Sequence, residues 1–376
     1  MVVAAFWLCV VGATYSYLWY PAILMILPAR RNYPEDPITI RKIAMVIAAR
    51  NEASKIVTKL DNTLELHSAG VALDVMVASD ASDDATDEIV QCYAEKGIRL
   101  VRSPVRKGKE FAQELAVAAT DADLIVFTDA GTTLSQDALI HVLDAFRDPS
   151  VGAVSSVDRF ITADGILQGE GAYVRYEMWL RDLETRFHSL VGLSGSFFAA
   201  RRNVCQRWDN RVPSDFGTAL SCAELGLQAI SDRRVIGYYK NIADDRKEYQ
   251  RKVRTVTRGM SGLRARAGVL NPLRYGRFSF EVFSHKLMRW ATPWFLAGAL
   301  WLSAALAFHL WIFRSIFAAQ VALYLAPVAS RIAPTLRKIR MVRIAAYFVE
   351  VNVAILHATL LVFSGRTILS WEPSRR

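Results

Sequence analysis

Acidic side chains follow three short apolar runs in this sequence. The run LDVMVAS leads into Asp80, the run LIVFT leads into Asp129, and the run KIAMVIAA is followed within three residues by Glu52. Short apolar runs bounded by polar residues are typical of buried strands. In an open parallel sheet the carboxyl ends of the strands lie along one edge, and ligands bind there. We therefore expect Asp80 and Asp129 to lie on the same rim and to face a site.

Most of the acidic segment SDASDDATDE, residues 79–88, has a structural explanation. Asp83 or Asp84 is in position to cap the helix that follows, and Asp87 and Glu88 fall in its first turn, where the helix dipole favours negative charge. Asp80 comes too early in the segment to be the cap. We interpret Asp80 as the functional residue of the segment.

An alternation of strands and helices in the middle of the chain must position these side chains. Apolar runs of strand length alternate with segments of helical spacing, which predicts parallel pairing and a doubly wound α/β sheet. The expected strands are residues 42–49, 73–79, 98–102 and 123–130, and the expected helices are residues 51–66, 84–97 and 108–120.

Membrane spans account for the high apolar content of the chain. Of its 376 residues 52% are hydrophobic, and the excess lies toward both ends. Residues 2–28 carry no charge and exceed the roughly 20 residues that a spanning helix needs, so we expect a retained anchor and not a cleaved signal. Arg30 and Arg31 follow at once, which by the positive-inside rule predicts a cytosolic middle domain.

Three further spans are expected in the last third of the chain, at residues 291–313, 315–330 and 344–364, the middle one short enough to be tilted or re-entrant. Glu350 and His357 in the last of them either have a function or face a neighbouring helix. The four cysteines lack Cys-x-x-Cys spacing and are expected to be reduced thiols. The predicted organisation is an N-terminal transmembrane helix (1–29), an α/β domain (30–245), basic amphipathic interface helices (246–290) and a C-terminal transmembrane region (291–376).

Positive charge is concentrated next to the expected spans. The formal net charge is +10, and residues 246–290 contain twelve Lys and Arg against two acids. A basic stripe beside a span is typical of binding to the anionic cytoplasmic leaflet, and this placement argues against nucleic acid as the partner. Seven side chains are assigned to lipid headgroups, namely Arg258, Arg264, Arg266, Arg274, Arg277, Lys286 and Arg289.

Seven segments, in order, resemble the motifs of the membrane-bound family 2 glycosyltransferases. They are VIAARNEASKI, VMVASDASDDATDE, RKGKEFAQELAVAATDADLIVFTDAGTTL, YVRYEMWLRDLETRFHSLVGLSGSFFAARR, VPSDFGTALSCAELGLQAI, QRKVRTVTRGMSGL and SHKLMRW. The similarity covers about residues 43–290. It implies a GT-A fold, a nucleotide-sugar donor such as a UDP-sugar, a divalent metal and inversion at the anomeric carbon.

On the donor side the resemblance assigns roles to three acids. Asp80 would contact the nucleobase, Glu52 would support Asp80, and Asp129 would face the ribose, the diphosphate and an Mg²⁺ or Mn²⁺ ion. The family's D-x-D motif reads Asp129-Ala130-Gly131 in this sequence. The second carboxylate is therefore replaced by Gly131, which weakens the prediction of a metal, because divalent cations of this kind are held by carboxylate and phosphate oxygens.

On the acceptor side the resemblance makes Asp215 the general base. An inverting transfer needs a base that takes the proton of the attacking hydroxyl. Read without the family, Asp215 in the stretch VPSDFG is equally typical of a helix N-cap. The resemblance also places Arg251 and Arg254 near the diphosphate, where an arginine fork donates paired hydrogen bonds. Lys109 in the stretch KGKE is a weaker candidate for the same contact, and we expect it to be a solvated helix start.

The resemblance leaves the acceptor open. A single-addition enzyme would glycosylate a lipid-linked acceptor at the cytoplasmic face of the inner membrane, and a processive synthase would extend a polysaccharide. About four spans favour single addition by a monomer. A non-enzymatic membrane adaptor with the same fold is a third possibility, which only Gly131 supports.

Overall fold

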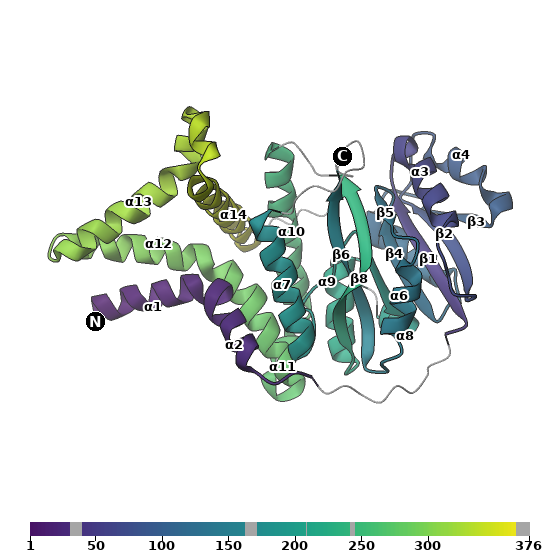
Figure 1. The fold of residues 1–376 in the computed structure, drawn as a ribbon, viewed down its shortest axis with the longest axis horizontal. Coiled ribbons are helices and arrows are strands. Elements are labelled where there is room, and N and C mark those ends of the chain that lie inside the picture. Colours follow the sequence, from purple (N-terminus) through teal and green to yellow (C-terminus); the bar gives the residue numbers. More distant parts are fainter. Residues whose placement is uncertain (31–39, 162–170, 208, 241–244, 366–376) are drawn as a thin grey trace. The chain divides into compact units, whose positions relative to one another are not determined.

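The computed structural model describes residues 1–30, 40–161, 171–207, 209–240 and 245–365. The chain divides into two compact units (Figure 1). The sheet unit comprises the described residues within 27–243 and 262–281, and the helical unit comprises those within 1–26, 244–261 and 282–368. The segment predicted as a single interface region, 246–290, is therefore shared between the two units.

One mixed sheet of eight strands organises the sheet unit. Its strands are β1 Lys42–Ala49, β2 Ala72–Ser79, β3 Ile98–Arg102, β4 Leu124–Asp129, β5 Thr132–Leu134, β6 Val151–Ile161, β7 Phe197–Arg201 and β8 Gln228–Lys240. Their order in the sheet is β3-β2-β1-β4-β7-β6-β8-β5. The four strands expected from the sequence pair in parallel, as predicted. Strand β8 also runs parallel to β6. Strand β7 runs antiparallel to β4 and β6, and β5 runs antiparallel to β8, so the sheet is mixed but mostly parallel.

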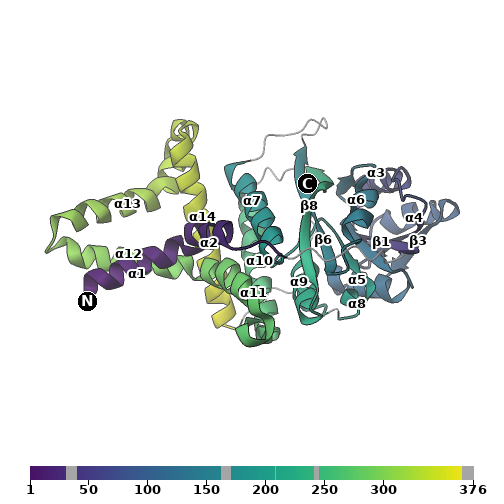
Figure 2. The same cartoon turned by 60° about the horizontal axis from the view of Figure 1, so that its bottom comes forward.

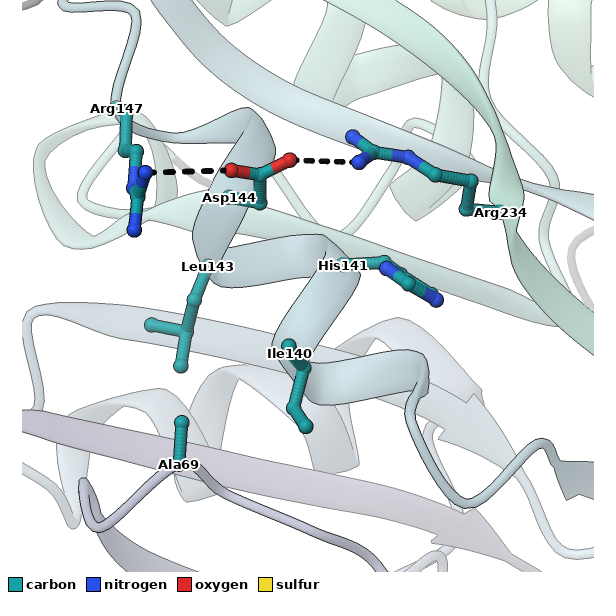
Figure 3. A pocket seen from close by; sticks show the side chains of 7 residues that line it. All are labelled: Ala69, Ile140, His141, Leu143, Asp144, Arg147 and Arg234. Atoms are coloured by element: carbon teal, nitrogen blue, oxygen red, sulfur yellow. Dashed lines mark ion pairs between the residues drawn. The ribbon is translucent and has the colours of Figure 1, made fainter.

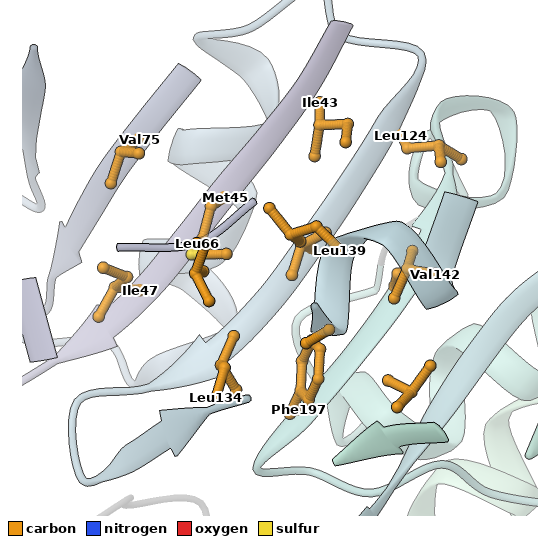
Figure 4. Close-up of a cluster of buried hydrophobic side chains, with 14 of the residues drawn as sticks. Ile43, Met45, Ile47, Leu66, Val75, Leu124, Leu134, Leu139, Val142 and Phe197 are labelled. Carbon is orange, nitrogen blue, oxygen red and sulfur yellow. The ribbon is translucent and has the colours of Figure 1, made fainter. Parts of the chain in front are cut away.

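Helices cover both faces of this sheet, which explains why its strands read as continuous apolar runs. One face packs against α3 Ala53–Leu64, α4 Thr86–Gln91 and α6 Ala138–Ala145, and the other against α5 Lys109–Ala118, α8 Arg202–Cys205 and α9 Ser214–Glu224. Figure 2 shows these layers on opposite sides of the strands. In the first layer Leu139 and Val142 of α6 pack over Ile43 of β1 and Phe197 of β7 (Figure 4).

The helical unit contains most of the expected spans. Four helical stretches are long and apolar enough to cross a membrane, at Val2–Ile26, Pro272–Ala307, Trp311–Ile332 and Arg340–Phe363. The short candidate at 315–330 belongs to a helix of 22 residues, which is long enough to span. The segment expected at 291–313 differs more, because its helix begins well before residue 291 and ends at Ala307.

The elements of these stretches are α1 Val2–Thr14, η1 Tyr15–Trp19, α2 Tyr20–Ile26, α11 Pro272–Val282, η4 Phe283–Leu287, α12 Met288–Ala307, α13 Trp311–Ile332 and α14 Arg340–Phe363. The remaining helices are η2 Ala94–Lys96, α7 Ala172–Phe187, α10 Asp245–Ala265, η3 Ala267–Leu270 and η5 Pro334–Lys338. Glu350 of α14 pairs with Arg331 of α13 at 3.2 Å, and His357 lies 3.2 Å from the Tyr249 hydroxyl of α10. Glu350 and His357 of α14 thus each face a neighbouring helix.

The assignment of Arg266 to lipid headgroups is wrong. Its guanidinium is largely buried in the sheet unit, where it donates to the Ser221 hydroxyl at 2.8 Å and to the Arg207 carbonyl at 2.7 Å. These contacts attach the segment after α10 to α9. Arg30 is likewise held by protein, because it pairs with Asp148 at 3.2 Å and hydrogen-bonds the Gln228 side chain. Charge counting could not separate these anchors from a lipid-facing stripe.

Candidate active site at the carboxyl edge of the sheet

Asp80 is a fully buried carboxylate directly after β2. One of its oxygens accepts the Lys107 N–H at 2.9 Å, and the Gly108 N–H lies 3.0 Å from both oxygens. Gly108 has a φ of 100°, which glycine adopts without strain. The Asp80 carboxylate therefore holds the loop before α5. Contact between Asp80 and a nucleobase stays a prediction.

Arg50 is a site residue that sequence reasoning missed. Its buried guanidinium donates to the carbonyl oxygens of Asp80 at 2.7 Å and Ala81 at 2.6 Å. Ala81 has a φ of 51°, a left-handed conformation that costs energy for a residue with a Cβ. Arg50 thus supports the turn after β2 through its backbone. Glu52, which the resemblance assigned to support Asp80, has its carboxylate paired with Lys55 at 2.8 Å, and its role at a donor stays a prediction.

Asp129 lies at the end of β4 and meets two other segments. Its carboxylate pairs with the Lys109 ammonium at 2.5 Å, and the same ammonium donates to the Gly195 carbonyl at 2.8 Å. The Asp129 N–H donates to the Ser196 carbonyl at 3.1 Å. The end of β4, the start of α5 and the loop before β7 are thereby joined. Lys109, expected to be a solvated helix start, is largely buried in this contact.

Asp215 lies in the first turn of α9, and Pro213 is the N-cap, so the capping explanation for Asp215 does not hold. The carboxylate lies beside Gly195: a Cβ at residue 195 would be 3.3 Å from Asp215 Oδ2. Among the residues that the structure describes, the Asp215 carboxylate has no hydrogen-bond donor. A half-buried, uncommitted carboxylate next to bare backbone is able to accept a proton from a bound hydroxyl.

The structure brings three of the predicted acids into one region of the sheet unit. Asp129 and Asp215 meet across Gly195, and Asp80 joins them through Gly108, the neighbour of Lys109. Arg251 and Arg254 lie on α10 in the helical unit, where Arg251 pairs with Glu248 at 2.8 Å. The role of these two arginines at a diphosphate stays a prediction.

Asp158 is a further carboxylate of the region that the sequence analysis did not name. It lies on β6 and accepts hydrogen bonds from the hydroxyls of Ser194 at 2.6 Å and Ser196 at 2.8 Å. These serines flank Gly195, so Asp158 positions the loop beside Asp215. The signal was present in the sequence, because Asp158 follows the apolar run VGAVSSV as Asp80 and Asp129 follow theirs.

A second hollow, of about 260 Å³, lies on the outer side of α6 and is lined by Ala69, Ile140, His141, Leu143, Asp144, Arg147 and Arg234. Its charged groups satisfy one another, because Asp144 pairs with Arg147 at 3.7 Å and with Arg234 at 2.7 Å (Figure 3). The lining contains none of the predicted site acids. We assign no ligand to this hollow.

The residues around Asp129 do not fit a divalent cation. The Asp129 carboxylate is already paired with an ammonium group, and Gly131 supplies no second carboxylate. Thr132 is no substitute, because its side chain is buried with its methyl group toward Gly237. Within the described parts of the chain, no three His, Cys, Asp or Glu side chains are grouped so that they could hold a metal.

Comparison with known proteins establishes the fold of the whole chain. A mannosyltransferase from Pyrobaculum calidifontis, solved in complex with GDP-Man and Mn²⁺, superposes with a TM-score of 0.73 over 96% of this chain and 99% of that one, at 21% identity. The sheet unit therefore has the GT-A fold, as expected from the motifs, and the described part of the chain also contains one N-terminal and three C-terminal apolar helical stretches.

The family follows from the sequence matches. Residues 44–208 match the family "Glycosyl transferase family 2", so this part of the chain is a family 2 glycosyltransferase domain. A beta-monoglucosyldiacylglycerol synthase of Trichormus variabilis is 24% identical over 55% of this chain, and an N-acetylglucosaminyltransferase of Rhizobium sp. is 25% identical over 57%. Each alignment covers 46% of the relative, so the chain spans about half the length of these curated relatives.

Substitution of Gly195 tests whether open backbone beside Asp215 matters. In Gly195→Ala the added Cβ would sit 3.3 Å from Asp215 Oδ2, which is tighter than ordinary contact and would displace the carboxylate or block the approaching hydroxyl. We expect a fall in kcat of at least about tenfold, equivalent to a 1.4 kcal/mol higher barrier. Gly268→Ala is the matched control, because Gly268 lies in the same unit outside the site and a Cβ built there has nothing within 4 Å. Equal activity of the two variants would contradict the placement of the reacting hydroxyl between Gly195 and Asp215.

Proposed function

We propose that this chain transfers a sugar from a nucleotide-sugar donor to a lipid-linked or glycan acceptor at the cytoplasmic face of the membrane, with inversion at the anomeric carbon. The observation that carries the proposal is the uncommitted Asp215 carboxylate beside Gly195, across from the Asp129–Lys109 pair. Inversion places the base on one face of the sugar and the leaving diphosphate on the other.

Asp215 takes the proton of the acceptor hydroxyl while its oxygen attacks the anomeric carbon. The carboxylate is suited to this role because it is half-buried and free of donors from the described residues. It lies in the first turn of α9, close to the acceptor loop beside Gly195. Asp158 holds the loop of Ser194 and Ser196 that borders the attacking hydroxyl.

A lipid is the acceptor class that we favour. The four apolar helical stretches give the chain the means to stay at a bilayer, where a lipid-linked hydroxyl is available. One curated relative is named for the synthesis of a glucosylated diacylglycerol, which agrees with a lipid acceptor without fixing the sugar. The donor base also stays open, because the solved neighbour holds GDP-Man and the resemblance suggests a UDP-sugar.

Radiolabelled nucleotide sugars offered to membranes that contain the protein test the proposed activity. We expect one donor to transfer label into the solvent-extractable lipid fraction, with release of the nucleoside diphosphate. Membranes carrying the Asp215→Asn variant control for other transferases, because that variant keeps the volume of the side chain and loses the base. Label that appears equally with both proteins would refute the assignment.

Cysteine labelling tests which side of the membrane the sheet unit occupies. Cys92 is exposed on this unit, whereas Cys205 and Cys222 are buried. We expect a membrane-impermeant maleimide to label the protein in inverted vesicles and to spare it in intact cells, because thiol labelling requires an accessible thiolate. Cys92→Ser is the control, which should abolish the signal. Labelling in intact cells would place the sheet unit outside.

A further inference from the structure

Three lysines surround the turn that carries Asp129. Lys109 pairs with the Asp129 carboxylate at 2.5 Å. Lys59 lies fully buried beneath the turn, where its ammonium donates to the Thr132 carbonyl at 2.7 Å and to the Thr128 hydroxyl at 3.1 Å. Lys55 is the side chain that a Cβ at Gly131 would meet. We call Lys55, Lys59 and Lys109 the lysine cluster.

The carboxylates that contact the lysine cluster are fewer than its lysines. Asp129 and Glu52 are the carboxylates that its members contact, and each is already paired, with Lys109 and Lys55 respectively. A divalent cation placed at Asp129 would have to displace the Lys109 ammonium group and would be repelled by Lys55. Lys59 adds less repulsion, because burial lowers its pKa to about 7. The same positive charges attract a diphosphate, which is an anion. At a given distance this attraction is as strong per unit charge as the repulsion of a cation.

Two members of the cluster have hydrogen-bond donors to spare. An ammonium group has three N–H donors. Lys109 directs its donors to Asp129 and to the Gly195 carbonyl, which leaves one. Lys55 directs one to Glu52, which leaves two, and its side chain is partly exposed. Lys59 is buried and cannot reach a ligand, and its hydrogen bonds to Thr128 and Thr132 stabilise the turn.

Steric crowding does not explain the glycine at position 131. Apart from Lys55 Cδ at 3.9 Å, nothing lies within 4 Å of a Cβ built there. Gly131 is also absent from the positive-φ glycines of the described chain, so a side chain would not strain the backbone. A carboxylate would therefore fit at this position. Glycine at this position leaves Asp129 as the one carboxylate of the Asp129-Ala130-Gly131 stretch.

We propose that this chain neutralises the leaving diphosphate with the ammonium groups of Lys109 and Lys55 in place of a divalent cation. The inference rests on the proposed function. As the bond between the anomeric carbon and the β-phosphate oxygen breaks, the electron pair stays on that oxygen, and the two ammonium groups stabilise the charge. The acceptor oxygen forms the new bond to the anomeric carbon, and its proton goes to Asp215.

Binding of UDP and of GDP to the purified full-length protein, measured by calorimetry in EDTA and again with Mn²⁺, tests the inference. We expect one of the two to bind in EDTA, with a dissociation constant that changes less than about threefold when Mn²⁺ is added. Lys109→Met should weaken binding in EDTA by about tenfold or more, because it removes a charge-assisted hydrogen bond to phosphate. Lys55→Met tests the second ammonium group in case Lys109→Met fails to fold.

Gly131→Asp is the converse variant, since it restores a second carboxylate. We expect its nucleotide binding to become tighter with Mn²⁺ by about tenfold, and one Mn²⁺ per chain to be detected by electron paramagnetic resonance in the presence of the nucleotide. Wild-type protein should bind no such Mn²⁺. Wild-type binding that is lost in EDTA and returns with one bound Mn²⁺ would overturn the lysine inference alone. Failure to bind either nucleotide under both conditions would overturn the proposed function as well.

Discussion

Asp215→Asn should abolish most of the transfer while leaving donor binding intact. The asparagine side chain has the same size and cannot accept the proton of the acceptor hydroxyl. Removal of a general base typically costs about 100- to 10,000-fold in rate, so we expect kcat to fall within that range. The dissociation constant of the nucleoside diphosphate should stay within about twofold, because the carboxylate lies on the acceptor side of Gly195.

Asp209→Asn provides the matched control for this result. Asp209 precedes the same helix and pairs with Arg211 at 3.0 Å; the Asp209 side chain is 19% exposed and that of Arg211 is 78% exposed. Its substitution removes an equal charge from a carboxylate that contacts Arg211 and none of the site residues, so kcat should stay within about twofold. Steady-state transfer assays separate kcat from KM for both variants. Normal turnover by Asp215→Asn would remove Asp215 as the base.

Asp80→Ala should destabilise the sheet unit as well as inactivate it. The substitution leaves the Lys107 and Gly108 N–H groups without their buried acceptor. Hydrogen bonds to a charged group contribute about 1.5–3 kcal/mol each, and a buried donor left unsatisfied costs about as much. We expect a loss of about 3 kcal/mol in the free energy of unfolding, which corresponds to a melting temperature roughly 6–12 °C lower for a unit of this size.

Asp83→Ala in the same turn is the control, because its side chain is 71% exposed and its pairing with Arg50 is long, at 3.4 Å. Exposed ion pairs contribute about 0–1 kcal/mol, so its melting temperature should change little. Differential scanning fluorimetry of the purified proteins makes the comparison, and UDP and GDP binding adds a second measurement. An Asp80→Ala protein with normal melting and lost nucleotide binding would favour the nucleobase role instead.

The sequence was sufficient for the strands of the first half of the sheet and for the apolar helices. Each expected strand is an unbroken apolar run because its residues are buried from both sides by helices. Membrane helices are equally easy to predict from the sequence, because the thickness of the bilayer sets the length of apolar chain that crosses it. Helix ends were less certain, as the end of α12 at Ala307 illustrates, because an apolar run continues beyond it.

Sequence reasoning was weakest where one polar side chain has to be told from its neighbour. It selected Glu52 in the stretch ARNE, whereas the guanidinium that supports the turn after β2 is that of Arg50. It left Asp158 unnamed and treated Lys109 as solvated. These contacts join residues between 30 and 86 positions apart, so neither spacing nor charge along the chain reveals them.

By itself the sequence determined the strands of the first half of the sheet, the apolar helices and the edge at which Asp80 and Asp129 lie, since these follow from local apolar patterns and the direction of parallel strands. Tertiary structure alone decided what each carboxylate faces. Asp80 is committed to backbone N–H groups, Asp129 to an ammonium group, and Asp215 to no donor among the described residues. The physical reason is that a carboxylate can act on a ligand only when it is not already paired, and folding brings its partners from distant parts of the chain.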